Sequence, residues 1–390
     1  MDALIAAGTL TSLGLAAWHH VGFPLVLKTA ARHRKSPVRP AAGPLPRITL
    51  IMPAYQEAAY VAAKIRNLAA LDYPSDRLKV VLGCDGCTDA TANLARAAHA
   101  EPECRHLDLE IVEFSRNRGK VAVVNDLVEA ADGDIVAMSD ISALVSMDAL
   151  RLAADWFADP DVGVVCATYR LLQPGSPGEA VYWRYQTAIK LAESRVGSTM
   201  GAHGALYLFR RALFTPLEAD TINDDFILPM RIVAQGFRAV YDPDLVALEL
   251  ERADPALDAR RRRRIATGNV QQAVRLLDLL APRHGWTAIL FGSGKVLRVA
   301  MPVLLVLAVA GTAWLAPSSL FFRGLLALEL LGLAAAALRA LTPRSRLTAP
   351  LAPLHYLTVG HLASVVGLIR YLRGHDGRWQ RATIALETVA

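Results

Sequence analysis

Residues 47–53 read RITLIMP, a short apolar run that ends at a proline. Its length and composition predict a buried strand, which the proline ends. Helix-like and strand-like segments alternate after it: we expect helices at 58–71, 90–100 and 120–131, and strands at 78–82, 109–114 and 134–138. Such alternation predicts a mostly parallel sheet with right-handed crossovers. The fold class is therefore α/β, with one soluble domain at residues 46–255.

Apolar segments on both sides of this domain predict membrane helices. Residues 1–27 are mostly apolar and precede a basic linker at 28–45, as in an uncleaved anchor with a cytosolic flank. A helix lying in the membrane interface is the alternative, because His19, His20 and Pro24 interrupt the run. Three later runs are each about as long as a bilayer requires: Met301–Ala316, Leu325–Leu341 and Leu351–Ile369.

We expect interfacial amphipathic helices at 256–298, a C-terminal transmembrane region at 299–371 and a tail at 372–390. An anchor followed by three full spans would place the basic residues at 370–381 outside the cell, against the positive-inside tendency. One segment is therefore expected to be re-entrant or interfacial. Glu329 lies inside an apolar run, so it should face another helix or a polar channel.

Composition also indicates a membrane protein. Of the 390 residues, 53% are hydrophobic and 20% are charged, so a polar globular part must coexist with apolar segments. The net charge is +6, and basic residues gather at the ends of apolar runs, which suits lipid headgroups and membrane topology more than nucleic acid. Four cysteines imply no disulfide framework, and Cys84 and Cys87 are best explained as small residues in a turn.

Acidic residues follow the expected strands, where ligands of open α/β sheets collect. They are Asp85 in GCDGCTD (83–89), Asp140 in SDIS (139–142), and the pair in NDD (223–225). Taken singly, an Asp-Gly turn explains Asp85 better than a nucleotide contact does, and helix capping explains the NDD pair better than catalysis does. As a site, Asp140 could hold a divalent cation against phosphate oxygens. Two adjacent carboxylates raise the proton affinity of one of them, as a general base needs.

In this order the segments resemble the inverting glycosyltransferases of family two, especially the membrane-integrated branch with cellulose, hyaluronan and poly-N-acetylglucosamine synthases. The matching segments are PAYQE (53–57) for P-A-Y-N-E, DGCTD (85–89) for D-G-S-T-D, NRGK (117–120) for N-x-G-K, SDISA (139–143) for the D-x-D region, and Asp224-Asp225 followed by GFR (236–238). The resemblance covers roughly residues 46–300 and implies a GT-A fold, a Rossmann-like nucleotide-sugar domain with N- and C-terminal transmembrane helices.

The resemblance also implies roles for individual residues. Tyr55, Glu57 and Asp85 would contact the uridine part of a UDP-sugar. Lys120 and Asp140 would hold the diphosphate, with Mg²⁺ or Mn²⁺ at Asp140 and Ser142. Asp225 would be the general base, beside Asp224. Arg264, within the arginine run at 260–264, would clamp the diphosphate, and contact with lipid headgroups is the alternative for that run.

Departures from the family pattern bear on the acceptor. The second acid of D-x-D is Ser142, a weaker metal ligand, and the Gln and Trp of Q-x-x-R-W are Arg261 and Ile265. The missing tryptophan is the one expected to stack on an acceptor sugar. His203 is interpreted as a packing residue rather than as a catalytic or metal-binding one. Tyr182, Trp183 and Tyr185 are interpreted as one face of an amphipathic helix rather than as a sugar platform.

The resemblance therefore predicts transfer of a sugar from a nucleotide-sugar donor to a lipid or growing glycan acceptor. The expected place is the cytosolic face of the cell membrane, in a multi-pass protein that binds no nucleic acid. Addition of one sugar to a lipid is favoured over processive exopolysaccharide synthesis. A catalytically inactive homologue that acts as a membrane assembly subunit is the alternative of another class. The sequence identifies neither the sugar nor any accessory subunit.

Overall fold

The computed structural model describes residues 1–41, 43–173, 177–251, 255–342 and 345–374. The chain forms two compact units. The first contains Leu27–Arg260 and Ala281–Thr287, and the second contains Met1–Val26, Arg261–Leu280 and the described residues from Ala288 onward. Each unit is described by itself below.

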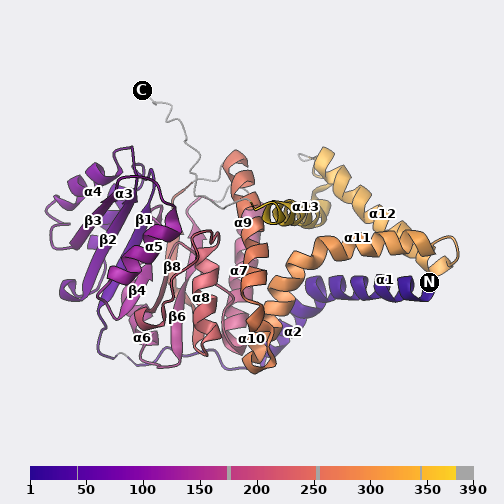
Figure 1. Ribbon diagram of the computed structural model, residues 1–390, viewed down its shortest axis with the longest axis horizontal. Coiled ribbons are helices and arrows are strands. Elements are labelled where there is room, and N and C mark those ends of the chain that lie inside the picture. Colours follow the sequence, from indigo (N-terminus) through magenta and orange to yellow (C-terminus); the bar gives the residue numbers. More distant parts are fainter. Residues whose placement is uncertain (42, 174–176, 252–254, 343–344, 375–390) are drawn as a thin grey trace. The chain divides into compact units, whose positions relative to one another are not determined.

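The first unit contains a mixed sheet of eight strands in the order β3-β2-β1-β4-β7-β6-β8-β5. Strands β1, β2, β3, β4, β6 and β8 are labelled in Figure 1. The predicted strands are confirmed as β1 (Ile48–Ala54), β2 (Leu78–Asp85), β3 (Asp108–Phe114) and β4 (Ile135–Met138), which pair in parallel. The later strands are β5 (Ala143–Val145), β6 (Val162–Leu171), β7 (Tyr207–Arg210) and β8 (Arg238–Glu249). Because β7 runs antiparallel to both β4 and β6, the sheet is mixed rather than mostly parallel.

Helices cover both faces of this sheet. The predicted helices are confirmed as α3 (Val61–Ala69), α4 (Thr91–His99) and α5 (Lys120–Ala130), and α6 (Ala149–Trp156), α7 (Pro177–Val196) and α8 (Asp224–Ala234) follow. The apolar faces of α3, α4 and α6 share one core with β1 and β2. On the other face α5 packs so closely on β2 that a Cβ at Gly83 would lie 2.7 Å from Val123 and Leu127.

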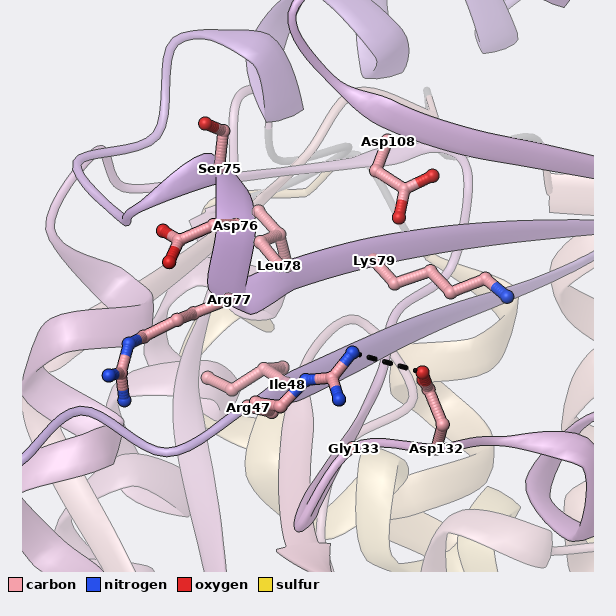
Figure 2. A pocket seen from close by; sticks show the side chains of 10 residues that line it. All are labelled: Arg47, Ile48, Ser75, Asp76, Arg77, Leu78, Lys79, Asp108, Asp132 and Gly133. Atoms are coloured by element: carbon pink, nitrogen blue, oxygen red, sulfur yellow. Dashed lines mark hydrogen bonds and ion pairs between the residues drawn. The ribbon is translucent and has the colours of Figure 1, made fainter.

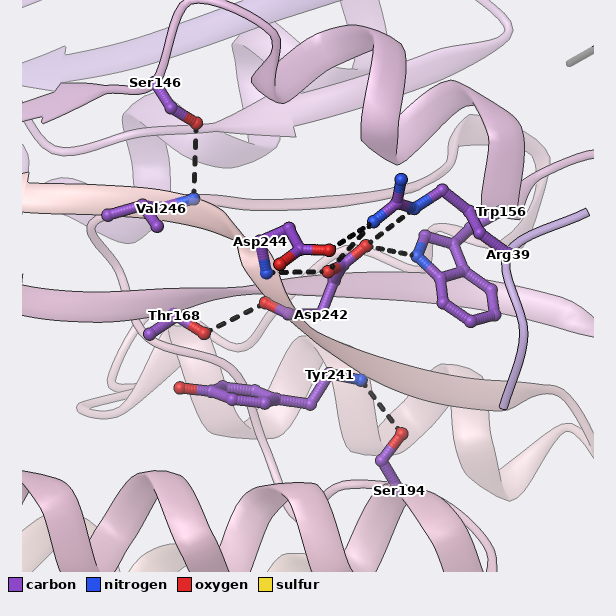
Figure 3. Close-up of polar contacts among 9 residues, drawn as sticks. All are labelled: Arg39, Ser146, Trp156, Thr168, Ser194, Tyr241, Asp242, Asp244 and Val246. Carbon is purple, nitrogen blue, oxygen red and sulfur yellow. Dashed lines mark hydrogen bonds and ion pairs between the residues drawn. The ribbon is translucent and has the colours of Figure 1, made fainter. Parts of the chain in front are cut away.

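The basic linker is tied to this unit by a buried acid (Figure 3). Asp242 of β8 is only 1% exposed, and its carboxylate accepts hydrogen bonds from Trp156 Nε1 at 2.7 Å and Arg39 Nε at 3.1 Å. Arg39 also pairs with Asp244 at 2.9 Å. One arginine of the linker therefore serves the fold rather than a lipid surface.

The second unit consists of helices. They are α1 (Asp2–Ala17), most of α9 (Pro255–Arg275), α11 (Leu297–Leu315), α12 (Leu320–Leu341) and α13 (Ala352–Leu372); α2 (Phe23–Arg32) and α10 (Trp286–Phe291) begin or end at its borders. Among the described residues, four helical stretches have the length and composition to cross a membrane: Asp2–Arg32, Trp286–Leu315, Leu320–Leu341 and Ala349–Leu372. These four long apolar helices indicate a membrane protein.

Polar residues of this unit lie at contacts between helices. A Cβ at Gly311 of α11 would lie 1.9 Å from Thr9 Oγ1 of α1, so only glycine permits this close approach. Thr312 of α11 donates a hydrogen bond to Glu329 Oε1 of α12 at 3.3 Å, so Glu329 faces a neighbouring helix, as its sequence context predicts. Two π-helical turns, at Trp18–Gly22 and Gly292–Val296, meet where Trp18 Nε1 donates to Ser293 Oγ at 3.0 Å.

Candidate active site

The carboxyl ends of the parallel strands bring most of the sequence-predicted residues to one edge of the sheet. Strand β1 ends before Tyr55 and Glu57, β2 ends at Asp85, and Asp140 follows β4. Because β1 is the parallel neighbour of both β2 and β4, these three ends lie side by side. The opposite edge holds a small cavity lined by charged residues, in which Arg47 pairs with Asp132 at 3.1 Å (Figure 2). That cavity contains none of the predicted site residues.

Asp85 orders a loop. The residue is fully buried, and its two carboxylate oxygens accept hydrogen bonds from the backbone N–H groups of Arg118 and Gly119, at 2.9 and 2.8 Å. Gly86, with φ of +63°, lies so close to this loop that a Cβ would be 2.3 Å from the nitrogen of Asn117. The DGCTD segment therefore holds the loop that leads into α5 and Lys120.

Lys120 joins two of the predicted acids. Its ammonium lies 3.2 Å from Asp140 Oδ1 and 3.3 Å from Asp224 Oδ2. Burial by itself would lower the pKa of Lys120, but the carboxylates of Asp140, Asp224 and Asp225 outweigh it and hold that pKa above its usual value. Asp140 and Asp224, which lie 20 and 104 positions after Lys120 in the chain, thus share one cation at the start of α5.

Asp225 is linked to Asp140 through a short segment that contains Gly204. The N–H of Gly204 donates to Asp225 Oδ2 at 3.2 Å, and the carbonyl of Gly204 accepts from the N–H of Asp140 at 3.1 Å. A Cβ at residue 204 would lie 2.7 Å from Asp140 Oδ2. Any larger residue at position 204 would therefore push the Asp140 carboxylate aside, a role of this glycine that the sequence did not reveal.

The loop after β1 is joined to the DGCTD turn. Gln56 adopts φ of +58°, and its side-chain carbonyl accepts hydrogen bonds from the N–H groups of Thr88 and Asp89 at 3.2 and 3.0 Å. The N–H of Glu57 donates to Thr91 Oγ1 at 2.8 Å. Tyr55 and Glu57 thus lie on a loop fastened to the end of β2, and their contact with a nucleotide stays a prediction.

Lys64 is a functional candidate that the sequence reading missed. Its ammonium is fully buried beneath the Asp140 turn and donates to Ser139 Oγ at 2.6 Å and to the carbonyl of Ala143 at 2.5 Å. Burial lowers the pKa of Lys64 to about 7. The helical spacing of Lys64 with the apolar residues Val61, Ile65 and Leu68 could have indicated its burial, because all four lie on the buried face of α3.

A divalent cation fits this edge only if the substrate completes its coordination. Asp140 offers a half-buried carboxylate, whereas Ser142 is buried and its carbonyl accepts from the N–H of Leu250 at 2.9 Å. Within the described part of the chain, no group of three or more His, Cys, Asp or Glu side chains could hold a metal ion. Mg²⁺ commonly binds through one or two carboxylates plus substrate phosphates, which is the arrangement that Asp140 permits.

Two further predictions concern His203 and Arg264. His203, in the segment before Gly204, stacks on Tyr169 with ring centroids 3.7 Å apart and meets Trp183 edge-on at 5.4 Å, which agrees with a packing role. Arg264 lies on α9, in the part that belongs to the second unit, and its proposed contact with a diphosphate stays a prediction.

Comparison with known proteins identifies relatives of this domain. The family described as "Glycosyltransferase like family 2" matches residues 46–268, more than half of the chain. An N-acetylglucosaminyltransferase of Azorhizobium caulinodans is 25% identical over 228 residues, which are 53% of this chain and 55% of that protein. A poly-beta-1,6-N-acetyl-D-glucosamine synthase of Staphylococcus aureus is 25% identical over 204 residues, which are 50% of this chain and 48% of the synthase. The chain thus spans about half the length of these curated relatives.

A solved structure resembles nearly the whole chain. It is the mannosyltransferase PcManGT from Pyrobaculum calidifontis in complex with GDP-Man and Mn²⁺, which is 27% identical and has a TM-score of 0.74. The match covers 95% of this chain and 100% of the mannosyltransferase. The likeness confirms the expected GT-A type of domain with its flanking apolar helices.

Proposed function

The chain belongs to glycosyltransferase family 2, and from that premise we propose that it is an inverting transferase with Asp225 as its general base. The donor is a nucleotide-sugar, for which we propose UDP as the nucleotide. The acceptor is a lipid or a growing glycan at the cytosolic face of the cell membrane. The observation that carries this proposal is the cluster in which Lys120 pairs with Asp140 and Asp224, with Asp225 next in the chain.

The negative charge of the donor's diphosphate determines which residues would bind it. A diphosphate needs cationic partners, and Lys120 is positioned at the N-terminus of α5, where the helix dipole also favours an anion. Asp140 would hold Mg²⁺ or Mn²⁺, which neutralises phosphate charge when bound. Tyr55 and Glu57 would contact the nucleoside, and Asp85 acts through the loop that it orders.

The transfer step needs one base. Asp225 removes the proton from the acceptor hydroxyl, and the oxygen forms a bond to the anomeric carbon while the bond from that carbon to the diphosphate breaks. The nucleoside diphosphate leaves with the electron pair, and an axial donor bond becomes an equatorial product bond. The hydrogen bond from the N–H of Gly204 orients the Asp225 carboxylate for this task.

Two acceptor classes are supported by different observations. Ile265 stands where the tryptophan of processive synthases is expected, which favours a single addition to a lipid. The relatives named as poly-N-acetylglucosamine synthases favour a growing glycan. We propose the lipid acceptor first and processive synthesis as the second candidate.

The test is nucleoside diphosphate release by the full chain in lipid nanodiscs with Mn²⁺, over a panel of UDP-sugars and GDP-mannose. Turnover should depend on the donor, and Asp225→Asn should lower it about 10²- to 10⁴-fold, the usual contribution of a general base. Asp108→Asn is the matched control, because Asp108 is an exposed acid at the start of β3.

Each outcome separates the candidates. Products that carry one sugar on a lipid support the first acceptor, and long polymers support the second. Equal turnover by wild type and Asp225→Asn would remove Asp225 as the base. No turnover and no nucleotide binding with any donor would favour the inactive assembly subunit.

A further inference from the structure

Tyr207 carries a buried hydroxyl close to the acid cluster. The residue lies on β7, opposite Met138 of β4 and Cys166 of β6, and only 1% of it is exposed. Among the residues that the structure describes, no hydrogen-bond partner satisfies this hydroxyl. Buried hydroxyl groups normally have partners, so an exception beside a candidate site requires an explanation.

The charged groups around the hydroxyl are those of the candidate site. Burial and the carboxylates of Asp224, Asp225 and Asp140 hold the pKa of Tyr207 well above its usual range. Cys166, the remaining titratable neighbour, is itself neutral, because burial raises the pKa of its thiol to about 12. Tyr207 is therefore a neutral phenol that can donate one hydrogen bond and faces groups that can only accept.

In the described part of the chain, the carboxylate of Asp224 lacks a hydrogen-bond donor at one of its buried oxygens. Its side chain is 8% exposed, and its Oδ2 pairs with Lys120 at 3.3 Å without any hydrogen bond from the described residues. Lys120 is also the ammonium that the diphosphate requires. A phosphate that draws this ammonium away leaves Asp224 as a buried charge without its partner, which is unfavourable.

We propose that Tyr207 is a positioning residue whose hydroxyl donates a hydrogen bond to the Asp224 carboxylate when the diphosphate of the donor engages Lys120. The inference rests on the proposed function, since it assumes that Lys120 binds a diphosphate. The new hydrogen bond gives the buried Asp224 carboxylate a partner while Lys120 is engaged by the diphosphate. Asp224 then stays in place, and it holds Asp225, the next residue in the chain, in position to remove the proton from the acceptor.

Tyr207→Phe isolates the hydroxyl, because the ring and its stacking on Phe209 are retained. In the full chain in nanodiscs, we expect kcat to fall roughly 10- to 100-fold, the worth of a hydrogen bond to a charged group, with little change in the donor KM. Without ligand, Tm should stay equal or rise, because the wild-type hydroxyl has no partner to lose. In an Asp224→Asn background the same substitution should cause no further loss of kcat.

Tyr73→Phe is the matched control. Tyr73 is also buried, but its hydroxyl donates to the carbonyl of Pro46 at 2.6 Å, so this variant should lower Tm and leave kcat unchanged. Three results would each overturn the inference while the proposed function stands. Tyr207→Phe could keep the wild-type kcat, or its Tm could fall as much as that of Tyr73→Phe. In the Asp224→Asn background, Tyr207→Phe could lower kcat by the same factor as in the wild type. A wild-type protein without turnover would instead count against the proposed function and against the inference with it.

Discussion

At the scale of the residue, hydrogen bonds to backbone groups decide what the acids do. Asp85 is a clear case, because both of its oxygens are engaged by the loop before Lys120. Asp140 and Asp224 are different, because their charges meet a side-chain ammonium that a ligand can compete for. The same residue type therefore holds backbone N–H groups in one place and a side-chain ammonium in another.

Lys64 provides a prediction about pH. Because burial lowers the pKa of Lys64 to about 7 from an ordinary value of 10.5, the unfolded chain binds a proton that the folded chain lacks between these pH values. The stability of the wild type relative to Lys64→Met should therefore rise as pH increases from about 7 to about 10, and the difference should be flat below pH 7. Measurement of Tm for both proteins from pH 5.5 to pH 10, in steps of about half a unit, checks this.

The control for Lys64 is Lys79→Met. Lys79 is partly exposed, and its hydrogen bond to Glu110 raises its pKa, so no titration is expected between pH 7 and pH 9. A pH-independent difference between the wild type and Lys64→Met would show that this ammonium is hydrated in the folded protein.

At the scale of the element, the glycines and the linker contacts determine how closely segments approach. Gly83 allows α5 to lie on β2, and Gly204 allows its segment to pass Asp140. The linker is held by the buried Asp242, which gathers donors from Trp156 and Arg39. These contacts join segments that are far apart in the chain.

Arg39→Gln tests the linker contact. The substitution leaves Asp242 buried without its cationic partner, so we expect a loss of about 1–3 kcal/mol in the free energy of unfolding, measured by denaturant titration. Arg47→Gln removes the exposed pair with Asp132 and should cost less than about 1 kcal/mol. Equal losses in the two variants would mean that the buried pair contributes no more than a surface pair.

At the scale of the whole molecule, the number of apolar stretches that cross the membrane determines which side each connecting turn faces. If all four apolar stretches cross the membrane and the first unit is cytosolic, the turn between α11 and α12 faces outward and the turn after α12 faces inward. Arg339 and Arg346 flank the inward turn, in agreement with the positive-inside tendency, whereas Arg370 and Arg373 at the end of the fourth stretch would face outward, against it.

Cysteine labelling of intact cells tests this topology. In a variant without native cysteines, Ser318→Cys should react with a membrane-impermeant reagent, whereas Ser75→Cys and Arg346→Cys should react only after permeabilisation. Labelling of Ser75→Cys in intact cells would contradict a cytosolic catalytic unit. Protection of Ser318→Cys would indicate that α11 and α12 do not both cross the membrane.

Three features could be predicted from the sequence alone: the alternation of strands and helices from residue 47 onward, the acids at strand ends, and the apolar helices. These features are local, because periodicity and turn residues act over a few positions. The sequence did not show that β7 (Tyr207–Arg210) inserts antiparallel between β4 and β6, because strand order depends on contacts between distant segments.

The partners within the candidate site became visible only in the folded chain. Lys120 pairs with acids 20 and 104 positions away, and Gly204 passes beside Asp140, which lies 64 positions before it. The hydroxyl of Tyr207 is buried without a hydrogen-bond partner among the described residues. No local pattern specifies such pairings, because burial and packing select them once the sheet has formed. The sequence thus determined which residue types reach this edge, and the packed sheet decided which of them act on one another.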